Sequence, residues 1–212
     1  MTSPRIIDHM CPAHVEACHV RWPIAGDWPE LSNQCEECEL RTRGLSSGQG
    51  LPDLTPEEVD QLHAIHEAGH AVAALHCGMP VASVEIWRSS ENRDRPDGGG
   101  YTDFGEDGWG VPLIGRLTVL WAGQEAMDRW LMETGLATDA NRLDVRFLAR
   151  NDARLFEETV AQEGSNMPRD MGVIDARDLV AAEWEQVVSL AAELVTHRRL
   201  SGDQVRGFLG FN

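Results

Sequence analysis

The sequence predicts a mainly α-helical domain of the α+β class, with a small β-hairpin or sheet and a short N-terminal arm that contains cysteine and histidine. Three observations predict this organisation. Long segments with apolar residues at helical spacing fill most of residues 55–212, and two short stretches of alternating polarity lie between the first and second of these segments. Residues 1–54 differ in composition and close with a Gly/Ser-rich linker, which sets them apart as a separate arm.

The N-terminal arm holds four of the five cysteines of the chain. Cys35 and Cys38 have the two-residue gap of one half of a structural zinc site. The other half is either Cys11 with His14, which have the same gap, or Cys11 with Cys18, whose gap is wider. The arm is therefore interpreted either as a small structural zinc site, with Cys11, His14, Cys35 and Cys38 as its candidate ligands, or as a loosely ordered segment with free thiols.

The first helix of the domain is predicted to begin after Thr55 and to end at Gly78. Thr55 is a favourable N-cap, Pro56 suits the first helical position, and the two glutamates that follow face the positive end of the helix dipole. Apolar residues then recur at helical spacing until Gly78, a residue type that commonly ends a helix.

The middle of this helix carries the sequence His66-Glu67-Ala68-Gly69-His70. Two histidines four residues apart lie on the same helix face, so both imidazoles can reach a single Zn²⁺ ion. Glu67 follows the first histidine and is placed to act as general base for a zinc-activated water. We therefore predict His66 and His70 as metal ligands and Glu67 as the catalytic residue; the alternative is a buried helix whose histidines only make hydrogen bonds.

Two short strands are predicted after this helix, in residues 81–87 and 101–104. The polar loop between them ends in three glycines, which allow close backbone approach, as beside a cleft where a peptide adds as an extra strand. The equally weighted alternative is a mobile hairpin tip. Tyr101, the only tyrosine, is a candidate oxyanion partner in the second strand, although an ordinary packing role is favoured.

The rest of the chain is predicted to be helical. Residues 111–133 form an apolar-periodic segment with small residues in its middle, which we expect to pack closely against the first helix at Gly69 and Ala73. Gly135 ends this segment. The later helices are expected at about residues 139–150, 153–162, 175–197 and 203–209.

Composition excludes several function classes. The net charge of -17 disfavours nucleic acid and anionic membranes as partners. All 18 basic residues are arginine, so no Walker-type phosphate loop with its lysine can form, and we expect no ATPase activity of the chain's own. The sequence shows no long apolar run and no apolar signal core at its start, and its odd cysteine count fits a reducing compartment, so a cytoplasmic location is predicted.

The order of these motifs resembles the peptidase domain of the FtsH family of zinc metallopeptidases. The resemblance covers about residues 56–209 and is strongest between residues 66 and 102, where an HEAGHA motif is followed by a GGYT motif. The segments that carry it are His66–Ala71, Pro80–Ile86, Gly99–Thr102, Gly123–Ala126 and Leu200–Val205.

The resemblance implies an HExxH zinc metalloendopeptidase whose third protein ligand is an aspartate on a later helix. Asp144 lies 74 residues after His70 and inside a predicted helix, so it is the expected ligand. Asp139 is the alternative, although its place near a helix start already gives it a structural role. Glu85 and Glu125 are less attractive, because they fall on a predicted strand and on the small-residue packing helix.

The chain also departs from the FtsH pattern, because the sequence contains neither the ATPase module nor the membrane segment of that family. We therefore expect it to cleave flexible or unfolded polypeptide, or to depend on a separate ATPase or adaptor that presents the substrate. An alternative from a different class is a catalytically silent, zinc-containing binding or regulatory module. Retention of Glu67 argues against that alternative, since metal binding needs no general base. A third hypothesis is a zinc hydrolase that acts on a non-peptide amide.

Overall fold

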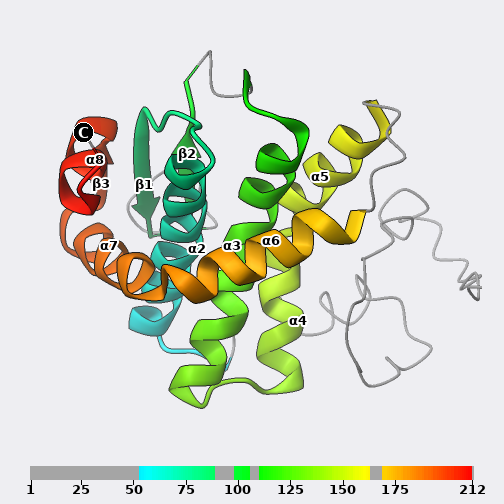
Figure 1. Ribbon diagram of the computed structural model, residues 1–212. Helices are drawn as coiled ribbons and strands as arrows, with labels where there is room; N and C mark the ends of the chain where they lie inside the picture. Colours follow the sequence, from blue (N-terminus) through cyan, green and yellow to red (C-terminus); the bar gives the residue numbers. More distant parts are fainter. Residues whose placement is uncertain (1–52, 89–97, 106–109, 163–168, 212) are drawn as a thin grey trace, which may run out of the picture.

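The structure, a computed structural model, is mostly helical with one small sheet, which confirms the predicted mainly α-helical α+β class (Figure 1). Its described residues contain seven helices and three strands. These residues are 53–88, 98–105, 110–162 and 169–211. The predicted ligands Cys11, His14, Cys35 and Cys38 of the N-terminal arm, and the alternative Cys18, lie outside the described residues.

Helix α2 (Pro56–His76) is the central element of the fold. It begins with a capping box in which the hydroxyl of Thr55 accepts a hydrogen bond from the amide of Glu58, and the carboxylate of Glu58 accepts one from the amide of Thr55. Residues 62–74 of α2 are all buried, as expected for a helix that is covered on every side. It packs against α3 (Leu113–Thr134), against α7 (Trp184–His197) and against the sheet. Among the described helices, none combines the length and apolar character needed to cross a membrane.

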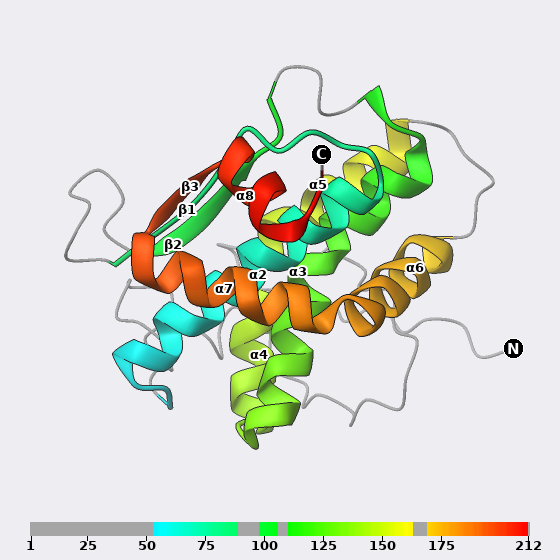
Figure 2. The same ribbon diagram turned by 60° about the vertical axis from the view of Figure 1, so that its left-hand side comes forward.

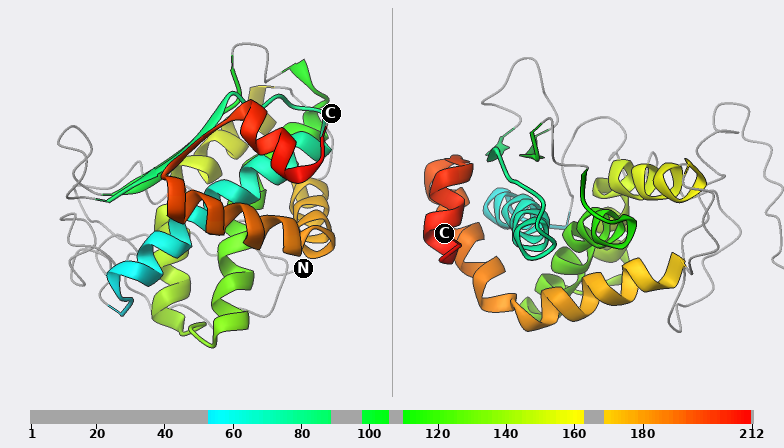
Figure 3. Two further views of the ribbon diagram at one scale, coloured as in Figure 1. Left: turned by 90° about the vertical axis from the view of Figure 1, so that its left-hand side faces the viewer. Right: turned by 45° about the horizontal axis from the view of Figure 1, so that its top comes forward.

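The sheet flanks α2 on one side, while α4, α5 and α6 lie toward the other side, around α3 (Figures 2 and 3). Its strands are β1 (Ser83–Trp87), β2 (Gly99–Asp103) and β3 (Arg199–Ser201), in the antiparallel order β2-β1-β3. The first two strands were predicted and are confirmed within about two residues. Strand β3 was not predicted, because three residues are too short to show alternation.

Small residues bring α2 and α3 into close contact, as the sequence predicted. A side-chain carbon added at Gly69 would lie 2.8 Å from the carbonyl oxygen of Ala122 and 2.8 Å from the Cβ atom of Ala126. Real Cβ atoms do not approach other atoms this closely, so Gly69 is required at this crossing. The close approach places the backbone of α3 next to the centre of α2.

The remaining helices are α4 (Asp139–Leu148), α5 (Arg150–Gln162), α6 (Arg169–Ala182) and α8 (Gly202–Leu209). The prediction of one continuous helix over residues 175–197 is wrong, because α6 and α7 separate at Glu183. The guanidinium group of Arg129 donates to the carbonyl oxygen of Ala181 at 3.2 Å and lies 4.7 Å from the ring centre of Trp184. This contact from α3 satisfies a carbonyl at the end of α6, where the chain changes direction (Figure 1).

Asp128 on α3 has a pKa raised to about 6. Burial disfavours its charged form, and the nearby carboxylate of Glu125 adds repulsion. The pKa is lowered by the charges of Arg146 and Arg142 and by a hydrogen bond from Gln124, but these effects are smaller than the rise. Ionisation of Asp128 therefore costs folding free energy at neutral pH.

Replacing Asp128 by asparagine should stabilise the protein at neutral pH. Because the pKa is higher in the folded than in the unfolded chain, stability falls as pH rises through the interval from the unfolded pKa of about 4 to about 6. We expect Asp128→Asn to gain about 1–3 kcal/mol at pH 7.5 and to lose this advantage below pH 4. Urea unfolding at pH 7.5 and below pH 4 measures the difference in the free energy of unfolding between the variant and the wild type. An equal gain in stability at both pH values would contradict the explanation.

Candidate metal centre

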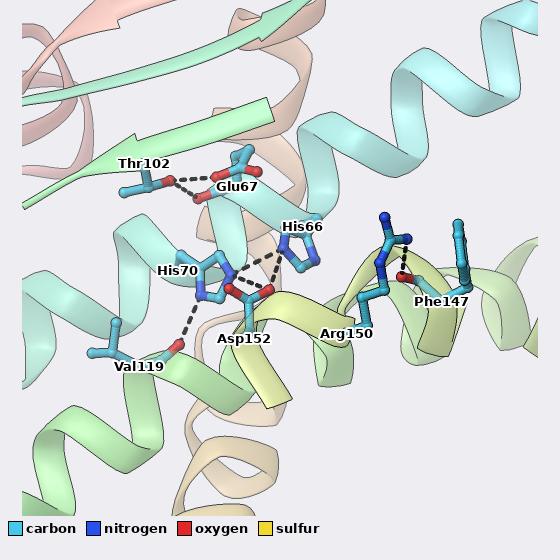
Figure 4. Close-up of polar contacts among 8 residues, drawn as sticks. All are labelled: His66, Glu67, His70, Thr102, Val119, Phe147, Arg150 and Asp152. Carbon is cyan, nitrogen blue, oxygen red and sulfur yellow. Dashed lines mark hydrogen bonds and ion pairs between the residues drawn. The ribbon is translucent and has the colours of Figure 1, made fainter. Parts of the chain in front are cut away.

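His66 and His70 lie one turn apart on the buried part of α2 and point their rings toward the same space (Figure 4). Their Nε2 atoms are 3.0 Å apart, and the two ring planes are nearly perpendicular, at 89°. Since α2 is covered on all sides, neither ring can swing away from this arrangement without displacing core residues. The helix therefore holds two imidazole nitrogens side by side, as the sequence motif predicted.

Asp152 completes the cluster from the first turn of α5. Its Oδ2 atom lies 3.0 Å from Nε2 of His66 and 3.5 Å from Nε2 of His70. One potential ligand atom from each of these three side chains falls within 4.8 Å of the others, so the group could hold a metal ion. We call this cluster of His66, His70 and Asp152 the metal centre.

The third member of the metal centre differs from the aspartate that the sequence analysis expected. Asp144, the expected ligand, is fully buried on α4 and is not part of the group. The alternative, Asp139, is exposed at the first position of α4 and is not part of it either. Both aspartates precede the sharp break between α4 and α5, whereas Asp152 follows it.

Asp152 was missed because it falls between two of the helices predicted from the sequence. The predicted helices ended near Arg150 and began again at Ala153, whereas α5 begins at Arg150. The spacing of Asp152 and Phe156 could have found it, since residues four apart share a helix face. Phe156 is fully buried against Trp121, so Asp152 at the preceding turn also faces inward.

The tautomer of His70 is set by the backbone of α3. Its Nδ1 atom lies 2.7 Å from the carbonyl oxygen of Val119, which can only accept a hydrogen bond. Nδ1 therefore carries the hydrogen, and in the neutral ring Nε2 presents its lone pair to the metal centre. Metal-binding histidines commonly have such a second partner, which fixes ring orientation. Nδ1 of His66 is buried and has no hydrogen-bond partner within the described part of the chain.

The charges of the three side chains of the metal centre influence one another strongly. Burial alone would lower the pKa of His70, but the carboxylate of Asp152 outweighs it and raises that pKa to about 9. Burial likewise tends to raise the pKa of Asp152, and the imidazoles of His70 and His66 instead hold it well below its usual range. Binding of a metal ion by these side chains would release the proton that His70 carries below this pKa.

The geometry of the metal centre fits zinc. Ligands about 2.0–2.1 Å from a tetrahedral zinc ion lie roughly 3.3 Å from one another. The three ligand atoms here are separated by 3.0, 3.0 and 3.5 Å. Two imidazoles and one carboxylate match the ligand types of catalytic zinc sites, which use three protein ligands and leave the fourth position open.

Glu67 lies beside the metal centre, where strand β2 covers it (Figure 4). Its Oε2 atom accepts a hydrogen bond of 2.7 Å from the hydroxyl of Thr102. Burial raises the pKa of Glu67, although the positive charge on His66 and His70 and the bond from Thr102 oppose the rise. A buried carboxyl that is held by a hydrogen bond beside a candidate cation site is placed as a general base would be.

Two glycines leave the space that the metal centre and Glu67 occupy. A side-chain carbon at Gly123 of α3 would lie 2.5 Å from Nε2 of His70 and 2.8 Å from Nδ1 of His66. A side-chain carbon at Gly100 of β2 would lie 2.6 Å from Oε1 of Glu67. The backbones of α3 and β2 therefore enclose the site from two sides.

The other residues considered from sequence lie outside the metal centre. His63 is buried, and burial followed by the nearby charge of His66 lowers its pKa to about 4. Tyr101 is half exposed on β2. Glu85 pairs with an arginine of β3. Glu125 accepts a hydrogen bond from an indole within α3.

Comparison with known proteins adds no independent assignment. No protein-family model matches the sequence, and no curated protein gives a match. The function is therefore inferred from the residues and geometry of the site itself.

Proposed function

We propose that the protein is a zinc-dependent metalloendopeptidase of the HExxH type. The observation that carries the proposal is the convergence of His66, His70 and Asp152 on one point with Glu67 directly beside it. The resemblance of residues 56–209 to the FtsH peptidase domain supports the same class and the same metal.

The ligands and the general base have distinct tasks in this reaction. His66, His70 and Asp152 would hold the ion, which supplies Lewis acidity to a water molecule and to the scissile carbonyl. Glu67 accepts a proton from the attacking water, whose oxygen forms a bond with the carbonyl carbon. Glu67 then returns that proton to the amide nitrogen as the carbon–nitrogen bond breaks.

The sheet supports an extended polypeptide as the substrate. Within the described residues β2 pairs with β1 on one side only, so its other edge has backbone groups available to an added strand. The same strand contacts Glu67 through Thr102. A segment paired with β2 would therefore lie next to the general base, whereas a small amide substrate would not need such an edge.

Replacing Glu67 by glutamine should separate metal binding from hydrolysis. The amide keeps the shape of the side chain but cannot accept the proton, so kcat should fall about 10²- to 10⁴-fold while zinc content stays unchanged. Cleavage of an unfolded protein such as casein by the zinc-loaded protein measures the change, with metal analysis in parallel.

Glu85→Gln is the matched control, because Glu85 lies on β1, pairs with Arg199 and is not part of the metal centre. It should cleave at the wild-type rate. Unchanged cleavage by Glu67→Gln would refute the proposed mechanism. Zinc binding without cleavage by the wild-type protein would instead favour a silent zinc-containing module.

A further inference from the structure

We propose that Thr102 is a positioning residue, which holds the carboxylate of Glu67 in the orientation needed for proton transfer. This inference rests on the proposed hydrolytic function and assigns a role in it to strand β2. Thr102 and Glu67 lie on different elements, 35 residues apart in the sequence, and meet beneath the sheet (Figure 4).

The hydrogen-bond geometry favours the carboxylate as the partner of the Thr102 hydroxyl. That oxygen lies 2.7 Å from Oε2 of Glu67 and 3.3 Å from the main-chain carbonyl oxygen of the same residue. A hydroxyl has one hydrogen to donate, and the shorter of the two contacts is the stronger hydrogen bond. Both side chains are buried, so water competes weakly for the bond.

The register of β2 places a second constraint on the same carboxylate. Thr102 pairs with Val84 and Gly100 pairs with Ile86 across the strands, so the two β2 residues face the same side of the sheet. Carbon Cδ of Glu67 would lie 2.8 Å from a side-chain carbon at Gly100. One β2 residue therefore binds the carboxylate, and the other leaves room for it.

Fixing Oε2 determines what the other oxygen can do. The terminal torsion of a glutamate is broad, so a carboxylate without a partner samples many orientations. A general base must stay within hydrogen-bond reach of the proton that it accepts. With Oε2 bound to Thr102, Oε1 is directed to a constant position beside Gly100 and is the atom assigned to proton transfer.

A matched pair of substitutions tests the role. Thr102→Val keeps the shape of the side chain and removes the hydroxyl, whereas Thr102→Ser keeps the hydroxyl and removes the methyl group. A bond to a charged group contributes enough for us to expect Thr102→Val to lower kcat about tenfold or more, with KM and zinc content unchanged. Thr102→Ser should stay within about threefold of the wild-type kcat.

A second measurement does not depend on activity. Melting temperatures are compared for Thr102→Val, Glu67→Ala and the double variant, all without added metal. If the two side chains are bonded, the double variant should lose less than the sum of the two single losses, because the first substitution already removes the interaction. Additive losses would overturn the proposed contact.

The outcomes separate this inference from the function on which it rests. If Thr102→Val keeps the wild-type kcat while Glu67→Gln is inactive, the role of Thr102 is overturned and the proposed function is not. Loss of zinc from Thr102→Val would also overturn it, since the residue would then support the metal centre instead. A zinc-loaded wild-type protein that cleaves nothing would overturn the proposed function and this role together.

Discussion

Asp152→Asn should remove one bound zinc per chain and abolish hydrolysis. The carboxylate of Asp152 lies 3.0 Å and 3.5 Å from the two imidazole nitrogens, and the asparagine amide cannot supply its negative charge. Changes at residues that only support a metal ligand cost about 10–100-fold in metal affinity, so we expect a loss greater than about a hundredfold for a ligand itself. Competition with a chromophoric chelator measures the affinity.

The two aspartates considered from sequence provide the controls. Asp139→Asn changes an exposed residue and should keep both zinc and activity. Asp144→Asn changes a fully buried residue, so it can lower stability, but the folded fraction should bind zinc with wild-type affinity. If folded Asp144→Asn loses zinc and Asp152→Asn retains it, Asp144 and not Asp152 is the third ligand.

Gly123→Ala should destroy the metal centre although alanine is the better helix former. Within a helix alanine is favoured over glycine by about 1 kcal/mol. The added carbon, however, would lie 2.5 Å from Nε2 of His70, a ring that is held by the carbonyl of Val119. We expect a folded protein whose histidines are displaced, with zinc affinity lowered at least about a hundredfold and no measurable hydrolysis.

Gly207→Ala is the matched control for this substitution. Gly207 lies within α8, and nothing lies within 4 Å of a carbon added there. This variant should gain up to about 1 kcal/mol of stability and keep wild-type zinc affinity. Circular dichroism confirms that both variants fold, and wild-type zinc affinity in Gly123→Ala would contradict the steric explanation.

Local chemistry allowed much of the fold to be predicted. Thr55, Thr138 and Ser201 accept hydrogen bonds from helix amides at the starts of α2, α4 and α8, and Gly135 adopts the left-handed conformation that ends α3. These features depend on residues within one helical turn, so the sequence displays them directly. His66, Glu67 and His70 belong to the same class, because a single helix sets their relative positions.

The rest of the site depends on contacts between distant segments. Asp152 reaches the histidines only because α5 begins immediately after α4, and Thr102 reaches Glu67 only because β2 crosses α2. The break between α6 and α7 involves Arg129 from another helix. No local pattern encodes the contacts between these segments. The sequence could therefore indicate the residue types required and, from the spacing to Phe156, an inward-facing Asp152, but not the contacts themselves.

The pairing of β1 with β3 has a consequence for the order of folding. Val84 pairs with Leu200, and Asp60 near the start of α2 binds Arg198 at 2.8 Å, so the sheet and the contacts beside it join segments that are distant in the sequence. Contacts of such large sequence separation form slowly and late. The three-stranded sheet would thus be completed later in folding than α2, whose local hydrogen bonds already set the spacing of His66 and His70.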